Sequence, residues 1–321
     1  MDHTGDQTRS ATVDTILRDE LARANRALSG VAPVISHMLE SSGHALVSDA
    51  IVARLRGMLG HLANQLLSAC QPDNARGPVD RAQVDAMSDA LAGDSKLLNH
   101  LYAVAMEGHL TERLQQRSSL DPVLSSLLQE LIASDQPAVA ELAMASLAAQ
   151  SRFMQSQRRM ELPLAELPPE LLLSVLERFC DADLPVPPNL RVEGAKALKA
   201  EYDEGAGRLG LLARLVTAMR EGAIAALELD HAGLALFASA VASRSKQPRD
   251  LAILACHERQ AARLALSLRA SGLEAEAIER QFLLLEPAQL LPEEIAQLAP
   301  ERALELLNAS GAAISYSNGA G

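Results

Sequence analysis

Aromatic side chains are almost absent from this chain, which has no Trp, three Tyr and four Phe among its 321 residues. Sheets are enriched in aromatic and β-branched residues, so this scarcity argues against a sheet-rich fold. Apolar residues nevertheless make up 48% of the chain. The core must therefore be filled by Leu and Ala, which favour helices. The composition predicts an all-α protein.

Cysteines and long apolar runs are also scarce. Cys70, Cys180 and Cys256 are an odd, widely spaced set without a C-x-x-C pair, so we expect reduced thiols rather than a disulfide framework. The longest strongly apolar stretch, Gly233–Ala242, has about half the length that a membrane-spanning helix requires. The N-terminal stretch Met1–Arg18 is polar and does not have the pattern of a signal peptide. We therefore expect a cytoplasmic protein without a membrane segment.

Positive charge is in deficit, with 29 basic against 41 acidic residues and a net charge of −12. Such a chain repels nucleic acid and anionic membranes unless a local patch reverses the sign. The charge balance therefore argues against both as partners.

Motifs that carry enzyme chemistry are missing or lack their context. Gly205-Ala-Gly207-Arg-Leu-Gly210 matches a dinucleotide fingerprint, but the segment before it, 195–204, is charged and helical where the fingerprint needs a strand. These glycines are expected to end one helix and begin the next. The eight histidines include no i, i+4 pair, and the adjacent Cys256 and His257 would point about 100° apart on a helix. We predict no catalytic residue, no metal site and no cofactor.

A helix pair is predicted at 121–150. Asp121-Pro122 has the cap and first-turn proline of a helix that runs to Ala133. The turn Asp135-Gln-Pro137-Ala-Val139 then opens a second, Ala-rich helix. A dozen-residue helix, an Asp/Pro turn and an Ala-rich helix together resemble a HEAT repeat, in which small residues let paired helices approach closely.

Proline recurs at predicted helix starts further along the chain, and Leu167-Pro-Pro-Glu-Leu171 is similar to Leu291-Pro-Glu-Glu-Ile295. This recurrence indicates degenerate helical repeats, each burying its apolar face against the next. The predicted fold is therefore a right-handed stack of antiparallel helix pairs, either a HEAT-like α-solenoid or an irregular helical array. A non-repetitive helical bundle is the alternative.

Proline density marks the predicted domain boundary. The predicted organisation is a disordered lead at 1–11, an N-terminal helical subdomain at 12–161, a Pro-rich boundary with one helix at 162–190, a C-terminal helical subdomain at 191–308 and a disordered tail at 309–321.

Two stretches resemble a known family. The first is Ser48-Asp-Ala-Ile-Val-Ala-Arg-Leu-Arg-Gly-Met-Leu59. The second runs from Leu234 to Pro287, with cores at Arg249-Asp-Leu-Ala-Ile-Leu-Ala255, Arg263-Leu-Ala-Leu266 and Gln281-Phe-Leu-Leu-Leu-Glu-Pro287. Together they are similar to a mainly alphaproteobacterial family of HEAT-like proteins that is known as a domain of unknown function. The resemblance implies a helical-repeat fold and a bacterial cytoplasmic protein, and it brings no site residue.

One stretch reverses the overall charge. Between residues 241 and 270, six basic residues stand against only Asp250 and Glu258. Arg259 and Arg263 are four apart and share a helix face. The stretch is either a patch that binds an acidic partner or phosphate, or a solvated face whose arginines pair with nearby carboxylates. The candidate patch consists of Arg244, Lys246, Arg249, Arg259, Arg263 and Arg269.

The sequence therefore favours a non-enzymatic protein–protein interaction or regulatory scaffold module that binds an unidentified, possibly acidic protein through a helical-array surface. The alternative is a helical enzyme or small-ligand-binding protein with a pocket between its two halves. A smooth groove of exposed Leu and Arg would favour the first function, and a deep apolar pocket with several polar groups would favour the second.

Overall fold

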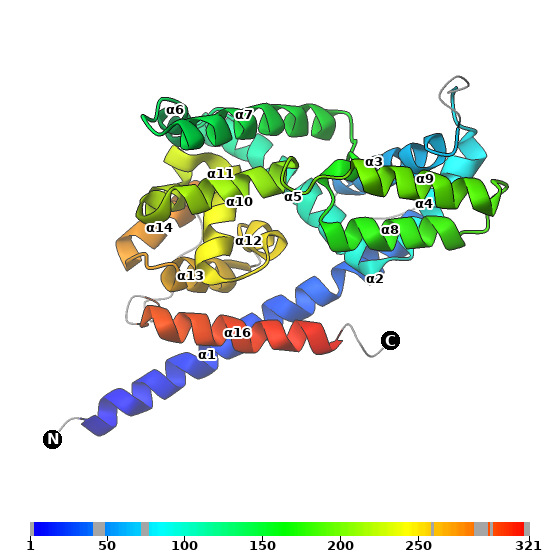
Figure 1. Cartoon of the computed structure of the whole chain (residues 1–321). Coiled ribbons are helices and arrows are strands. Elements are labelled where there is room, and N and C mark those ends of the chain that lie inside the picture. Colours follow the sequence, from blue (N-terminus) through cyan, green and yellow to red (C-terminus); the bar gives the residue numbers. More distant parts are fainter. Residues whose placement is uncertain are drawn as a thin grey trace. The chain divides into compact units, whose positions relative to one another are not determined.

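The structure is a computed structural model, which describes residues 3–40, 49–71, 77–257, 260–285, 295 and 298–317. Helices make up 80% of the chain, and the described residues contain no strand. The chain is therefore an all-α helical array (Figure 1), as its Leu- and Ala-rich composition predicts.

The chain divides into two compact units, each assembled from separated segments. Unit 1 comprises Met1–Val31, His109–Met144 and Leu212–Gly321, and unit 2 comprises Ala32–Gly108 and Ala145–Leu211. The chain passes between the units within four helices: α2 (Val31–Glu40), α5 (Ser95–Ser118), α7 (Pro137–Arg158) and α10 (Arg208–Ala218).

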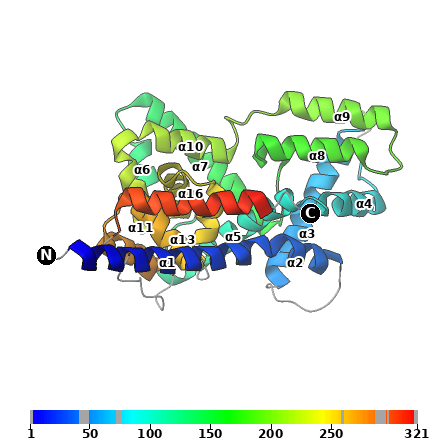
Figure 2. The same cartoon turned by 90° about the horizontal axis from the view of Figure 1, so that it is seen from below.

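Unit 1 is built around one helix, α13 (Ala261–Ala270), which contacts five others. Its residues are buried without interruption from Arg263 to Arg269, as expected of a central helix that is apolar on most sides. The other elements that lie wholly within unit 1 are α1 (His3–Ser29), α6 (Ser126–Ile132), the 3-10 helix η3 (Arg220–Leu227), α11 (Leu229–Ser245), α12 (Arg249–Ala255), α14 (Ala275–Leu285) and α16 (Pro300–Ser317). The two terminal helices, α1 and α16, pack on α13 and on each other (Figures 1 and 2).

A glycine bends α11 near its start. Gly233 has φ +69°, a left-handed conformation that residues with a side chain rarely adopt, and an added Cβ would meet Ser125 Cβ at 3.2 Å. The bend lets α11 approach α6, whose buried residues Leu127 and Leu128 lie in the same unit.

Unit 2 contains α2 (Val31–Glu40), which begins one residue before it, and α3 (Asp49–Ser68), α4 (Arg81–Ala92), the 3-10 helix η2 (Leu164–Glu166), α8 (Pro169–Asp181) and α9 (Pro188–Glu201). Here α3 packs on α4 and α9, and α8 packs on α9 and α4. Both α8 and α9 begin with a proline, which has no N–H to leave unpaired in the first turn of a helix.

The chain ends differ from their prediction. The predicted disordered lead at 1–11 is helical from His3 onward, and the predicted disordered tail at 309–321 is helical as far as Ser317. Extending a helix that is already formed fixes one residue for each hydrogen bond gained, so even polar or Ser/Gly-containing ends can continue it. Residues 318–321 lie outside the described part of the chain.

Two helices, α6 and α7, begin in the segment 121–150. Pro137 begins α7, as the Asp/Pro turn predicts. The first helix starts later than predicted, because Asp121 Oδ1 instead accepts hydrogen bonds from the N–H groups of Val123 and Leu124, both at 2.8 Å, in a turn. Ser125 is the residue that caps α6.

The Pro-rich segment at 162–190 contains η2, α8 and the start of α9, and all of it lies within unit 2. Its single complete α-helix, α8, matches the one helix predicted there. The division between units instead falls inside helices, where no local composition marks it.

Candidate functional site

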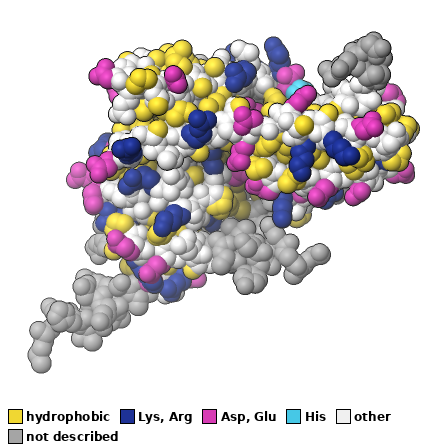
Figure 3. Space-filling model, in the orientation of Figure 1, with side chains coloured by type: hydrophobic (Ala, Val, Ile, Leu, Met, Phe, Trp, Pro, Cys, Tyr) yellow, Lys and Arg dark blue, Asp and Glu magenta, His cyan; other side chains and the backbone are white. Residues whose placement is uncertain are grey.

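The predicted basic patch does not form one exposed surface. Arg244 and Lys246 are exposed at the end of α11, but Arg249 is half-buried and Arg263 and Arg269 are buried. Arg259 lies outside the described residues. A binding patch would require Arg263 to face solvent, but Arg263 is only 1% exposed. On the face drawn in Figure 3, Lys and Arg side chains are scattered among Asp and Glu.

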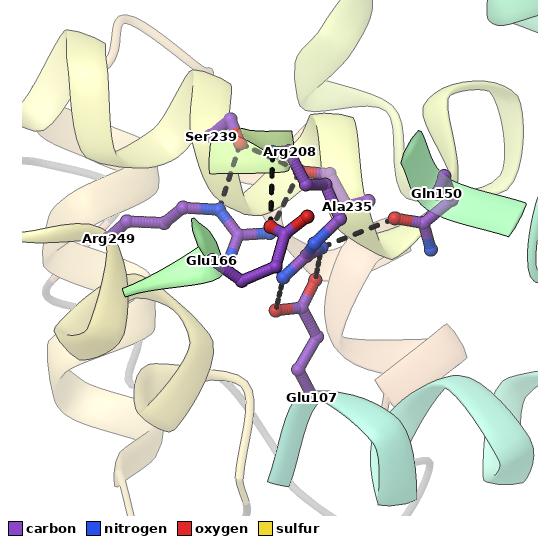
Figure 4. A network of polar contacts seen from close by, with 7 residues as sticks. All are labelled: Glu107, Gln150, Glu166, Arg208, Ala235, Ser239 and Arg249. Carbon is purple, nitrogen blue, oxygen red and sulfur yellow. Dashed lines mark hydrogen bonds and ion pairs between the residues drawn. The ribbon is translucent and has the colours of Figure 1, made fainter. Parts of the chain in front are cut away.

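Two of these arginines hold their own unit together through neutral oxygens. Arg249 Nε donates to Ser239 Oγ at 3.0 Å and its Nη2 to the Ala235 carbonyl at 3.4 Å, which ties the start of α12 to α11 (Figure 4). Arg269 donates to the carbonyls of Leu298 and Leu273, at 2.6 and 2.9 Å. Arg269 also forms an ion pair with the exposed Glu274 at 3.0 Å, which is the kind of contact that the alternative prediction, a face paired with nearby carboxylates, expects.

Arg263 is the least satisfied of the group. Its Nη2 donates to Asn25 Oδ1 on α1, but its Nε and Nη1 are buried and have no hydrogen-bond partner among the residues that the structure describes. Beside it, Gln260 Nε2 donates to the Ala24 carbonyl at 3.0 Å while Gln260 Oε1 is also unpartnered. Asn25 Nδ2 in turn donates to the Ser310 carbonyl of α16 at 3.0 Å. These side chains form a polar cluster among α1, α13 and α16, which we call the Arg263 cluster.

Burial lowers the pKa of the Arg263 guanidinium to about 10, and no described carboxylate counters this shift. The side chain is therefore still charged at neutral pH. A buried cation is stable only when it is paired and its donors are satisfied, so the Arg263 cluster stores unfavourable free energy. A negatively charged group would relieve it.

The two terminal helices that cover this cluster are joined by charge. Arg302 on α16 donates from Nε to Asp14 Oδ2 on α1 at 2.9 Å, and its Nη2 donates to the same oxygen. Arg302 also pairs with Glu305 in the next turn of its own helix. An ion pair near the middle of α1 and the Arg263 cluster near its end therefore fix α1 at two points.

Unit 2 contains a buried ion pair that the sequence did not reveal. Arg208 and Glu107 have side chains only 2% and 1% exposed, and Nη1 and Nη2 of the arginine donate to the two carboxylate oxygens at 2.7 and 3.0 Å (Figure 4). Arg208 Nη1 also donates to Gln150 Oε1 at 3.2 Å, and its guanidinium lies 3.6 Å from the centre of the Phe153 ring. The partners are 101 residues apart in sequence, so spacing could not have shown the pair.

The glycine motif explains how Arg208 reaches this position. The first two glycines lie between α9 and α10, as predicted, and Gly210 lies within α10. A Cβ on Gly210 would sit 2.2 Å from the Glu204 carbonyl oxygen, so only glycine allows this close approach. The Arg208 N–H donates to Glu166 Oε2 at 3.1 Å. The glycines of this motif therefore allow close packing of the backbone at the start of α10.

Groups of three or more His, Cys, Asp or Glu side chains that could hold a metal ion do not occur in the described residues. Cys256 is buried, and Cys70 and Cys180 are half-buried. Burial raises the pKa of the Cys70 thiol, although Arg191 partly opposes the shift. Such a thiol is mostly protonated near neutral pH and is a poor nucleophile.

Within the described part of the chain, no single helix is long and apolar enough to cross a membrane, and η3 and α11 meet that test only together, across a bend of 115°.

The chain matches no protein-family model, and no curated protein or solved structure is significantly similar to it. Its function therefore has to be argued from its own residues.

Proposed function

We propose that this chain is a non-enzymatic interaction module of the bacterial cytoplasm that binds an acidic segment of another protein through basic groups of unit 1. The observation that carries the proposal is Arg263, a buried cation that has one neutral amide as its hydrogen-bond partner and two nitrogens without an acceptor among the described residues. A carboxylate from a partner would supply both the missing charge and the missing acceptors.

Two further features support this function. Arg244 and Lys246 are exposed at the end of α11, and Arg244 Nε donates to the Ser271 carbonyl directly after α13. Basic groups are thus present near both ends of the central helix in a chain whose net charge is −12. The helical array and the resemblance to HEAT-like proteins fit a protein whose function is to present a surface.

The experiment is affinity purification of the tagged chain from its native host, followed by mass spectrometry. We expect a stoichiometric acidic partner whose capture weakens as salt is raised, because exposed charges are screened. Replacing Arg244 and Lys246 by Glu should reduce capture without unfolding the chain, since exposed ion pairs contribute at most about 1 kcal/mol.

A matched control reverses two exposed charges of unit 2, with Arg158→Glu and Arg159→Glu, and should leave capture unchanged. Capture that is insensitive to salt and to the unit 1 reversal, or equally sensitive to both double variants, would contradict the proposal.

A further inference from the structure

The N-terminal helix α1 covers the buried cation of Arg263 with a poorly matched ligand, the amide of Asn25. We propose that α1 is an autoinhibitory cover, and that the site it occupies on α13 is the docking site for an amphipathic helix of a partner protein that carries a carboxylate where α1 has Asn25. This inference rests on the proposed function and names its site and its regulation.

The first step concerns how α1 is held. Leu17, Leu21 and Ala24 are buried, at the i, i+4 and i+7 spacing of one helix face. Its residues contact chiefly α13 and α16. At the end of this apolar face, the Ala24 carbonyl and Asn25 Oδ1 accept hydrogen bonds from Gln260 and Arg263 of the Arg263 cluster. A helix from another protein could present the same face.

The second step concerns why Asn25 is a poor ligand. An amide offers one neutral oxygen, which here accepts from Arg263 Nη2 alone. The two unpartnered groups, Nε and Nη1, lie on either side of Nη2 in the planar guanidinium. A carboxylate at the position of Asn25 could therefore accept from Nη2 and from one of them in the bidentate geometry that arginine prefers. It would also neutralise the buried charge.

The third step concerns how α1 is released. The ion pair between Asp14 and Arg302 fixes the other part of α1 and does not involve α13. Weakening this pair should therefore loosen the cover without changing the docking site. Placing a carboxylate at residue 25 of the chain itself should do the opposite and hold the cover closed.

The test uses the purified full chain and a fluorescent synthetic peptide that copies residues 13–29 with Asn25→Asp. Control peptides keep Asn25 or replace it with Leu. We expect the Asp peptide to bind about ten-fold more tightly than the Asn peptide, because hydrogen bonds to a charged acceptor are the stronger ones. The chain with Arg263→Met should lose this preference.

Variants of the chain set the cover in opposite directions. Asp14→Asn should speed hydrogen exchange of the α1 amides and strengthen binding of the Asp peptide, whereas Asn25→Asp in the chain should slow exchange and weaken binding. Equal binding of the Asp and Asn peptides to the wild-type chain, or a preference that survives Arg263→Met, would overturn the inference. So would α1 exchange that neither variant alters.

A second copy of the chain is the competing occupant, because its α1 could dock in exchange. Light scattering should show that the Asp14→Asn chain stays monomeric, and a dimer that the Asp peptide dissociates would overturn the assignment to a different protein. Failure of the autoinhibitory cover can be distinguished from failure of the proposed function. If the host partner is captured equally well by Asp14→Asn and Asn25→Asp chains, the function stands and the cover does not.

Discussion

The two units each bury an arginine almost completely, but they treat its charge in opposite ways. In unit 2, Arg208 has a carboxylate that accepts two hydrogen bonds, an amide that accepts a third and an aromatic ring against its guanidinium. In unit 1, Arg263 has one amide acceptor and two donors with none. Each arginine has at least one nitrogen without a hydrogen-bond partner among the described residues, but only Arg208 has a carboxylate that matches its charge.

The difference teaches where function should be sought. A buried cation that is already paired with a carboxylate has little left to offer an anion, because a new anion must displace the existing one. A buried cation without a carboxylate gains free energy from any anion that can reach it. The Arg263 cluster is therefore the better candidate for a binding site, although Arg208 makes more hydrogen bonds.

The largest change in the free energy of unfolding is expected for the buried ion pair between Arg208 and Glu107. Glu107→Gln keeps the size of the side chain but leaves the buried charge of Arg208 without a counter-charge, so the free energy of unfolding should fall by about 3–5 kcal/mol. Urea denaturation followed by circular dichroism measures the change. As a control, the double variant Glu107→Leu with Arg208→Met should be much closer to wild type, because it removes both charges. A small effect of Glu107→Gln would mean that the pair is not buried as described.

Replacing Arg263 should change the free energy of unfolding in the opposite direction. Replacing it by Met removes an uncompensated buried charge and keeps the volume, so the free energy of unfolding should stay the same or rise by about 1–2 kcal/mol. Because burial lowers the pKa of Arg263 to about 10, the unfavourable contribution is fully present below that pH and fades only above it. The gain should therefore be constant between about pH 6 and pH 9.

The same urea titrations measure this effect, with Arg269→Met as the matched control. Arg269 is also buried on α13, but it donates to two carbonyls, so its loss should destabilise unit 1 by about 1–3 kcal/mol. If Arg263→Met destabilises as much as Arg269→Met, the contrast between the two units disappears.

The fold class could be predicted because it depends on signals that are local in sequence. Leu- and Ala-rich periodicity predicts helices wherever they occur, and prolines mark several of their starts, such as Pro137 and Pro169. Glycines were interpreted correctly as connectors because the segment before them is helical. The helical chain ends were missed because their polar composition gives no periodic signal.

The destinations of the arginines could not be predicted in this way. Spacing places residues four apart on one helix face, but it does not say whether that face points to solvent or to another helix. For Arg263 the facing residue is Asn25, which is 238 residues away in sequence. Glu107, the partner of Arg208, is 101 residues away, so both arginines depend on tertiary packing that one sequence does not reveal.

The smallest expected change in the free energy of unfolding concerns Asp94, and it tests whether other buried charges of unit 2 are also paired. Asp94 is buried, and its Oδ1 accepts from the N–H groups of Lys96 and Leu97 at the start of α5, at 2.9 and 3.2 Å. Its Oδ2 accepts from Ser174 Oγ on α8 at 2.6 Å and lies 3.4 Å from Arg178 Nε.

Burial alone would raise the pKa of this carboxyl, but the hydrogen bond from Ser174, those from the backbone and the charge of Arg178 together lower it. A lowered pKa in the folded state means that Asp94 stabilises the fold above its unfolded pKa of about 4 and loses this contribution as the pH falls through its folded pKa. Asp94→Asn should therefore reduce the free energy of unfolding by about 1 kcal/mol at pH 7, and urea titrations should show the difference from wild type shrinking towards zero below about pH 3. A difference that is the same at both pH values would show that the charge of Asp94 is unmatched in the folded state, and unit 2 would then resemble unit 1.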